Sequence, residues 1–486
     1  MTANSANQQL LCKLLCKFAF IVPLICLNNA VPYRKLPFGL NGHSVAYHSY
    51  DEMTEFLKHI ASEYPKYAHL QSIGRSVQGR HIWALSIAGQ DPHKHVLLRP
   101  EVALIANMHG NEVVGKELLL YLADYLLTTH EVDANITRLM SVCRIHLLPS
   151  INPDGLAAAR GEGDCDQADH IGRWNANNVD LNRDFLNRLH NSAKHSNKSA
   201  FQPETVALMG WLERVPLVLA ANLHGGALVA NYPWDSNLEE KPIYTESPDD
   251  DVFDHLATLY SRTHPTMHKG LQCENDEAFP GGITNGAMWY PVDGSLQDYQ
   301  YAFHGTMALT LEISCCKYPP ASTLEQHWLE NRDALIMFLD QADKGVRGLI
   351  TDGEGVGISD AELMVKGRDI RFNTTARGEF WRHLLPGEYI LEIESAGFVS
   401  ATVPFTIPPF NRYPPYVALN ITLIKEQTLK QTEISKKQKE TTGDEKYNSH
   451  DASPSNVWKA GIARLSKRNL TAFSFWYGTI LRSGEV

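Results

Sequence analysis

The chain has 486 residues and is too long for one ordinary domain, while its content of 43% hydrophobic and 20% charged residues is usual for a globular protein. Its formal net charge is −11 at pH 7, and no basic stripe is interleaved with aromatic residues. These properties argue against a protein that binds nucleic acid. Net acidity could favour cationic substrates, although net charge alone is weak evidence for this.

The first 30 residues have the pattern of a secretory signal peptide. Lys13 and Lys17 precede an apolar run at 18–27, which is shorter than a comfortable membrane span and contains Pro23. We therefore expect residues 1–30 to be removed, and the mature protein to be secreted or to lie in the lumen of the secretory pathway. An N-terminal membrane anchor is the alternative interpretation.

Five cysteines remain after this cleavage: Cys143, Cys165, Cys273, Cys315 and Cys316. Secretion permits disulfide bonds, and an odd number predicts at least one thiol that is free or pairs with another chain. The sequence leaves the pairing open. Sequons for N-glycosylation agree with a secretory route and begin at Asn135, Asn197, Asn373, Asn420 and Asn469.

Segments typical of strands and helices alternate from about residue 50 to residue 343. Strands are predicted at 102–108, 144–149, 217–223 and 307–314, and helices at 50–64, 112–128, 204–213, 251–260 and 324–342. This alternation predicts an α/β domain over residues 45–343, with a mixed, mostly parallel sheet flanked by helices. Functional side chains are expected at the carboxyl ends of its strands.

The pattern changes after residue 344. Short strand signals separated by turn residues predict a small antiparallel β-sandwich over residues 345–425. Residues 426–486 are expected to form a disordered polar tail with a short aromatic end at 473–481, which is too short to span a bilayer. No clear membrane anchor is visible, which leaves membrane association open.

Two candidate metal ligands lie three positions apart, where the strand predicted at 102–108 meets the next helix. His109 and Glu112 can point the same way, and imidazole nitrogens and carboxylates both bind zinc. A glutamate favoured by the helix dipole, next to a histidine without a metal, is the alternative for this motif alone. A catalytic zinc needs a third protein ligand, and His224 ends a predicted strand and precedes two glycines. Among the other histidine candidates for the third ligand, His146 fits a core position, and His170, His190 and His195 fit exposed loops.

Five segments together closely resemble the zinc metallocarboxypeptidases, in particular the regulatory subgroup of carboxypeptidases E, M, N and D. They are NMHGNEVVG at 107–115, PSINPDG at 149–155, GRWNANNVDLNR at 172–183, HGGALVANYPWD at 224–235 and LEISCCKYP at 311–319. The resemblance covers about residues 45–425, and the β-sandwich is similar to the transthyretin-like domain of that subgroup. Asn178 departs from the usual glycine, but asparagine tolerates a left-handed backbone.

The resemblance implies a catalytic centre with one zinc ion. His109, Glu112 and His224 would bind the metal. Glu312 would act as the general base for the attacking water, since a carboxylate can take its proton and pass it to the leaving amine. Arg173 would polarise the scissile carbonyl and stabilise the negative charge that develops on its oxygen.

The resemblance also implies which residues bind the substrate. Asn182 and Arg183 would hold its C-terminal carboxylate, which suits the two-pronged donor geometry of arginine. Tyr290 would cap the terminal residue. Asp235 would pair with a Lys or Arg side chain, and Asp298 would add charge or make only a loop hydrogen bond.

We therefore expect a monomeric zinc metallocarboxypeptidase that removes single C-terminal Lys or Arg residues from peptides and proteins, as in peptide or prohormone processing. One alternative is an inactive, zinc-containing peptide-binding protein of the same fold. Retention of Glu312, Arg173, Arg183 and Tyr290 argues against it. Another is a related zinc hydrolase that acts on acylated amino acids, which the β-sandwich and Asp235 disfavour.

Overall fold

The computed structural model describes residues 46–428 and 431, apart from residues 164, 166–170, 190–200, 271–272 and 274–277. The expected signal peptide, nearly all of the expected tail and the sequons at Asn197 and Asn469 lie outside the described residues, as do His170, His190 and His195. Within the described part of the chain, no helix combines the length and apolar character needed to cross a membrane.

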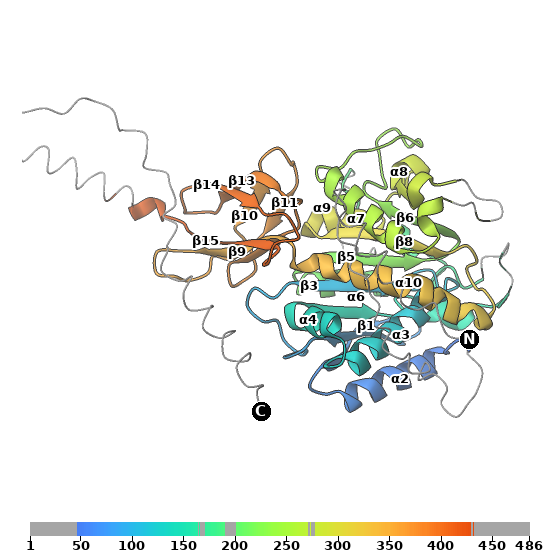
Figure 1. Cartoon of the computed structure of the whole chain (residues 1–486). Helices are drawn as coiled ribbons and strands as arrows, with labels where there is room; N and C mark the ends of the chain where they lie inside the picture. Colours follow the sequence, from blue (N-terminus) through green and yellow to red (C-terminus); the bar gives the residue numbers. More distant parts are fainter. Residues whose placement is uncertain are drawn as a thin grey trace, which may run out of the picture. The chain divides into compact units, whose positions relative to one another are not determined.

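A large mixed sheet forms the centre of the first domain (Figure 1). Among the described residues its eight strands lie in the order β1-β2-β4-β3-β5-β8-β6-β7. Their bounds are β1 (Ala68–Arg75), β2 (His81–Ile87), β3 (Glu101–Ala106), β4 (Arg144–Leu148), β5 (Leu217–His224), β6 (Ala227–Tyr232), β7 (Ile283–Asn285) and β8 (Met307–Ser314). The central pairs β4–β3, β3–β5 and β5–β8 are parallel, as is the edge pair β6–β7, whereas β1–β2, β2–β4 and β6–β8 are antiparallel.

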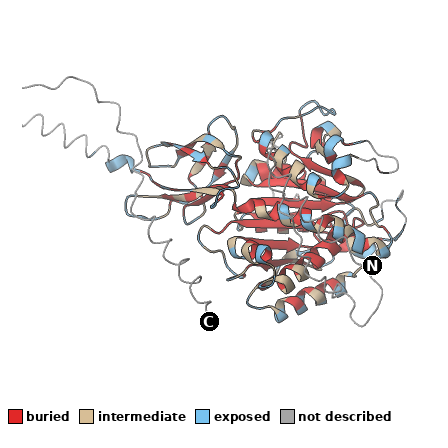
Figure 2. Cartoon of the chain, viewed as in Figure 1, coloured by how far each residue is buried: buried red, intermediate tan, exposed pale blue. Residues whose placement is uncertain are grey.

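Helices cover both faces of this sheet (Figure 1). They are α2 (Tyr50–Glu63), α3 (Val114–Thr129), α4 (Ala134–Val142), α5 (Pro153–Ala158), α6 (Pro203–Leu212), α7 (Asp250–Thr263), α8 (Gly286–Trp289), α9 (Leu296–His304) and α10 (Leu324–Leu339). α6 and α9 share an apolar cluster with residues of β2, β3, β5 and β8. Every residue of β3, β5 and β8 is buried, which explains why these strands read as continuous apolar runs (Figure 2).

The predicted α/β fold is confirmed, and the four predicted strands and five predicted helices appear within a few residues of their expected bounds. One local expectation is wrong. Glu112 does not begin the helix, because α3 starts at Val114 and Glu112 lies in the preceding loop. β1 was missed because its side chains are mostly half-buried, so that it lacks a clear apolar face, and β7 because it has only three residues.

The second domain has two small sheets around one apolar core. The four-stranded sheet contains β11 (Arg371–Asn373), β10 (Glu362–Val365), β13 (Gly387–Glu394) and β14 (Ala401–Ile407), and the three-stranded sheet contains β12 (Glu379–Arg382), β9 (Gly345–Thr351) and β15 (Tyr416–Thr422). The expected antiparallel β-domain is present, with one parallel pair between β9 and β15.

Buried ion pairs join the two domains. The carboxylate of Asp249, just before α7, is fully buried and pairs with the buried Arg382 of β12. It also accepts hydrogen bonds from the Tyr301 hydroxyl at 2.7 Å and from Arg368 Nη1 at 2.9 Å. Arg368 makes a second ion pair with Asp251, whose side chain is 49% exposed. Asp249 therefore provides the buried negative charge that balances Arg382 and Arg368 between the two domains.

We expect Asp249→Ala to destabilise the protein by about 3–5 kcal/mol, because Arg382 would remain buried without its partner. Asp251→Ala is the matched control and should cost under about 1 kcal/mol, since its carboxylate is half exposed to water. Urea unfolding followed by circular dichroism measures both. Equal losses in the two variants would contradict the dominant role of the buried pair.

Candidate active site

The candidate site lies at the carboxyl ends of parallel strands of the large sheet. His109 follows β3, His224 is the last residue of β5, and Glu312 lies near the end of β8. His224 and Glu312 are opposite each other in the register of the β5–β8 pair. Neighbouring parallel strands thus bring together residues that lie far apart in the sequence, as expected for a sheet of this kind.

The loop from Asn107 to Val113 is shaped by its own sequence. Asn107 adopts a left-handed backbone with φ of 56°, which asparagine tolerates. Its side-chain Nδ2 donates to the carbonyls of His109, Gly110 and Glu112 at 3.1, 2.9 and 3.1 Å. Gly110 packs so closely on Gly155 that a Cβ there would collide with its backbone. The loop therefore holds His109 and Glu112 toward the same point.

The side chains of three residues converge beside this loop. Nδ1 of His109 is 3.0 Å from Glu112 Oε1, and Nδ1 of His224 is 2.8 Å from Glu112 Oε2 and 3.2 Å from His109 Nδ1. All three residues are buried. Ligand atoms about 2.0–2.1 Å from a tetrahedral zinc lie roughly 3.3 Å apart, so this set of two imidazoles and a carboxylate fits a catalytic zinc site.

The second ring nitrogen, Nε2, of each imidazole also lies within hydrogen-bonding distance of another side chain. His109 Nε2 is 3.0 Å from Asp180 Oδ1, an arrangement that orients a metal-binding imidazole. Burial alone would raise the pKa of Asp180, but its hydrogen bond to His109 and the charge of Arg173 hold the pKa well below its usual range. His224 Nε2 is 2.7 Å from the side-chain amide of Asn222. If that amide rotates, its oxygen can accept the Nε2 proton while Nδ1 binds the metal.

Glu312 lies beside the ligands without being one of them. It is buried, and no described residue donates a hydrogen bond to its Oε2. Burial, followed by the negative charge of Glu112, raises the pKa of Glu312 to about 7. A buried carboxylate with an available oxygen suits a group that exchanges a proton with a small molecule near neutral pH.

Arg173 approaches the ligands from the loop before Asp180. Its Nη2 is 2.8 Å from Asp180 Oδ2, and its Nη1 is 3.2 Å from His109 Nδ1 and 3.5 Å from Glu112 Oε1. Burial alone would lower the pKa of Arg173, but the negative charges of Glu112 and Asp180 raise it. The guanidinium therefore stays charged at the edge of the metal-binding cluster.

The residues predicted to bind substrate lie nearby. Asn182 Oδ1 accepts the N–H of Leu296 at 2.9 Å, and Arg183 Nη1 donates to the Asn182 carbonyl at 2.8 Å. Tyr290 follows α8 and is 45% exposed. Burial of its phenol and the charge of Glu312 raise the pKa of Tyr290 to about 12, so the hydroxyl remains a hydrogen-bond donor.

Asp235 is buried behind these residues. Its Oδ1 accepts hydrogen bonds from Gln297 Nε2 at 2.7 Å and Asn231 Nδ2 at 3.3 Å. Gly286 leaves room for this carboxylate, since a Cβ at that position would collide with Oδ1. Burial raises the pKa of Asp235 above its usual value. A cation entering beside the carboxylate would favour its charged form.

One cavity of about 210 Å³ unites the predicted residues. The residues that line it include all nine: His109, Glu112, Arg173, Asn182, Arg183, His224, Asp235, Tyr290 and Glu312. Asp298 is not among its lining residues. The structure thus brings the nine together in one place, while the role of each in catalysis or binding stays a prediction.

Several residues of the site were missed by the sequence reasoning. Asp180 lies inside the motif at 172–183 and Lys317 inside the motif at 311–319, so both had a signal in the sequence. Lys317 Nζ is 3.7 Å from Glu112 Oε1, and Lys317 lines the cavity. Asn222 and Gln297 gave little signal, because their importance depends on which side chain they touch in the folded protein.

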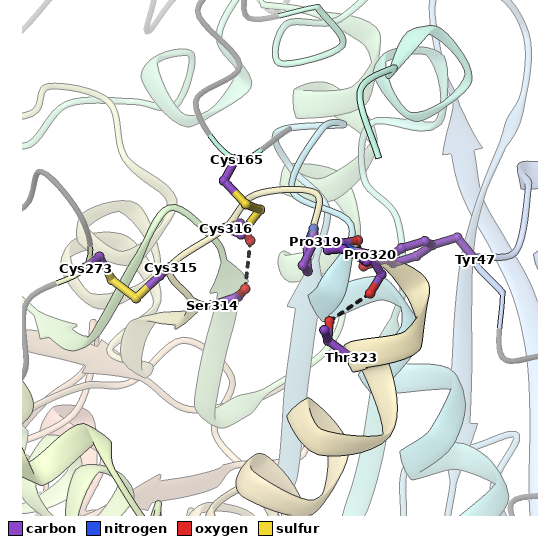
Figure 3. The surroundings of a disulfide bond; sticks show 9 residues. All are labelled: Tyr47, Cys165, Cys273, Ser314, Cys315, Cys316, Pro319, Pro320 and Thr323. Carbon is purple, nitrogen blue, oxygen red and sulfur yellow. Dashed lines mark hydrogen bonds between the residues drawn. A yellow bond between two sulfur atoms is a disulfide. The ribbon is translucent and has the colours of Figure 1, made fainter. Parts of the chain in front are cut away.

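Two adjacent cysteines, Cys315 and Cys316, directly follow β8, and each forms a disulfide bond with a cysteine of a separate loop (Figure 3). Cys165 pairs with Cys316, and Cys273 pairs with Cys315. Cys143 is buried and free, which confirms the expectation of at least one unpaired thiol. Asn178 has a left-handed backbone with φ of 58°, a conformation that asparagine tolerates.

The comparisons with known proteins agree with this geometry. The family model described as Zinc carboxypeptidase matches residues 53–334, and the model described as Carboxypeptidase regulatory-like domain matches residues 345–423. Over 357 residues the chain is 44% identical to carboxypeptidase D of Drosophila melanogaster, covering 72% of this chain and 25% of that protein. The chain therefore spans about a quarter of the length of that relative.

Two shorter relatives are matched over most of their length. The chain is 43% identical to carboxypeptidase M of Mus musculus over 367 residues, covering 74% of this chain and 81% of that protein. It is 39% identical to the carboxypeptidase N catalytic chain of Rattus norvegicus over 384 residues, covering 75% of this chain and 83% of that protein. His109, Glu112 and His224 form its zinc site, and the chain belongs to the zinc carboxypeptidase family, in the group of carboxypeptidases D, M and N.

Proposed function

We propose that this protein is a zinc-dependent metallocarboxypeptidase that hydrolyses single C-terminal Lys or Arg residues from peptides and proteins, as in peptide or prohormone processing. The observation that carries the proposal is the buried carboxylate of Asp235, which lines the same cavity as the metal ligands and Glu312. A carboxylate in an enclosed pocket favours a cationic side chain and penalises an apolar one.

In this proposal the chemistry is divided among three groups of residues. Zinc held by His109, Glu112 and His224 would lower the pKa of a water and polarise the scissile carbonyl. Glu312, which lines the cavity, accepts the proton of the attacking water on its carboxylate and delivers it to the leaving amine. Arg173 donates to the carbonyl oxygen as negative charge develops there, from a guanidinium already held by Asp180.

Other residues that line the cavity hold the substrate's C-terminal residue. Arg183 binds its carboxylate, because a planar guanidinium that uses Nη1 on a backbone carbonyl still has further N–H donors in the same plane. Asn182 supports this position, and the half-exposed Tyr290 closes over the bound residue. Asp235 then receives the Lys or Arg side chain.

The proposal includes the organisation and location of the protein. Residues 1–30 act as a cleaved signal peptide, 45–343 form the catalytic domain, 345–425 form a transthyretin-like domain, and 426–486 form a tail. The enzyme works as a monomer, outside the cell or in the lumen of the secretory pathway. The disulfide bonds Cys165–Cys316 and Cys273–Cys315 support an oxidising compartment.

Glu312→Gln should lower kcat for a dansylated dipeptide ending in Arg by roughly 10²–10⁴-fold, because the amide cannot accept the water's proton. Zinc content, measured by plasma mass spectrometry, should stay near that of the wild type. His224→Ala is the matched control and should lose zinc as well as activity. Near wild-type turnover in the Gln variant would contradict the role of Glu312 as general base.

Asp235→Ala tests the function itself. The variant should lose about two orders of magnitude in kcat/KM for C-terminal Arg, because the substrate cation would be left unpaired in a buried pocket. Release of Leu and Phe from matched dansylated dipeptides should change far less or rise. Equal losses on Arg and Leu would mean that Asp235 supports the pocket without reading the side chain. A wild-type protein that binds zinc but releases no residue would instead support an inactive peptide-binding protein.

Asp180→Ala should weaken zinc binding by about 10–100-fold, because the imidazole of His109 loses the carboxylate that orients it. Competition with a chromogenic zinc chelator measures the dissociation constant. Asp254→Ala, at an exposed position on α7, is the control and should bind zinc as the wild type does. An unchanged zinc affinity in Asp180→Ala would remove this carboxylate from the metal site.

A further inference from the structure

A second buried aspartate lies directly behind Asp235. Asp298 in the first turn of α9 is 5% exposed and does not line the cavity. Its Oδ1 accepts the backbone N–H of Asp235 at 2.9 Å, and its Oδ2 accepts the backbone N–H and the hydroxyl of Ser236 at 3.2 and 3.0 Å. Both carboxylate oxygens thus bind the backbone segment that carries Asp235.

Arg188 contacts the residues on either side of Asp235. Its Nη2 donates to the carbonyl of Ser236 at 2.7 Å, and its guanidinium lies 4.0 Å from the centre of the Trp234 ring. Its Nε is 3.9 Å from Asp298 Oδ2, so the cation also faces the second carboxylate. Contacts on both sides of Asp235 fix the direction in which its side chain leaves the backbone.

The arrangement separates two acidic groups that differ in what they face. Asp235 faces the cavity, whereas Asp298 faces N–H and O–H donors of the protein. Burial and the nearby charge of Asp235 raise the pKa of Asp298 to about 8, and the positive charge of Arg188 opposes this shift. Asp298 therefore accepts hydrogen bonds from the protein and does not face a substrate in the cavity.

We propose that Asp298 and Arg188 are positioning residues that determine specificity by holding the Trp234–Ser236 segment so that the carboxylate of Asp235 points into the cavity. The inference rests on the proposed function, since it assigns to Asp235 the recognition of a basic side chain. It assigns no charge recognition to Asp298 itself. Asp298 acts through Asp235, and its loss should change which C-terminal residue is preferred.

Asp298→Asn keeps the size of the side chain but places an amide NH₂ where one of the accepting oxygens stood. At least one hydrogen bond to residues 235–236 is then lost, and the Asp235 carboxylate should shift. We expect the ratio of kcat/KM for C-terminal Arg to that for C-terminal Leu to fall by about tenfold or more. Asp254→Asn, at an exposed position, is the matched control and should leave the ratio unchanged.

A double-mutant cycle distinguishes positioning from direct recognition. In an Asp235→Asn background, adding Asp298→Asn should leave the Arg-to-Leu ratio unchanged, because Asp298 acts only through the carboxylate already removed. A further fall of the ratio in this background would show that Asp298 reads the substrate charge, and would overturn the inference. An unchanged ratio in the single variant would overturn it as well.

Two further measurements keep the inference testable on its own. If Asp298→Asn does not fold, Arg188→Lys removes the planar contact with Trp234 and the bond to Ser236, and should lower the same ratio to a smaller extent. If the wild type shows no preference for Arg over Leu, the proposed function fails. A crystal structure of Asp298→Asn, or of Arg188→Lys, then decides the inference, because an unmoved Asp235 carboxylate would overturn it.

Discussion

The negative charge of Glu112 is fully buried between two imidazoles, and the surrounding site is arranged to balance it. An isolated buried carboxylate would cost several kcal/mol, so it persists only with partners of opposite or variable charge. His109 and His224 contact its two oxygens, the backbone N–H of Gly225 donates to Oε2 at 3.2 Å, and Arg173 and Lys317 lie beyond. A divalent cation at the same point satisfies this demand directly, which ties the stability of the site to metal binding.

Two pairs of neighbouring buried carboxylates lie at or directly behind the cavity, and the members of each pair have different surroundings. Glu112 is held by histidines, while the neighbouring Glu312 has its pKa raised and an oxygen without a described partner. Asp298 is held by backbone donors, while the neighbouring Asp235 faces the cavity. In each pair one carboxylate is fixed by the protein and the other is available to a small molecule.

The sequence predicted most of the strands and site residues that are marked by apolar runs or short motifs. β3, β5 and β8 are buried on both faces, so their continuous apolar residues and the polar residues after them could be read directly. Helix α3 was predicted two residues too early, because Glu112 continues the helical pattern while the hydrogen bonds of Asn107 hold the chain in a loop. The pairing of Cys315 and Cys316 with separate loops, and the contact of Asp298 with residues 235–236, depend on distances between remote segments that no local pattern specifies.

The contacts that the β-domain makes with the first domain lie away from the cavity. His95 Nδ1 is 2.5 Å from Glu101 at the first position of β3, and His95 Nε2 is 3.0 Å from Glu379 of the β-domain. Arg382 Nη1 donates at 2.7 Å to the carbonyl of Gly305, just before β8 begins. These contacts lie at the amino ends of strands whose carboxyl ends carry the site, and a strand of six residues spans roughly 17–20 Å. None of the residues lining the cavity comes from the described part of the β-domain. The β-domain therefore contacts the first domain at the amino ends of β3 and β8 and, through Asp249, next to α7 and α9, while it contributes no described residue to the cavity itself.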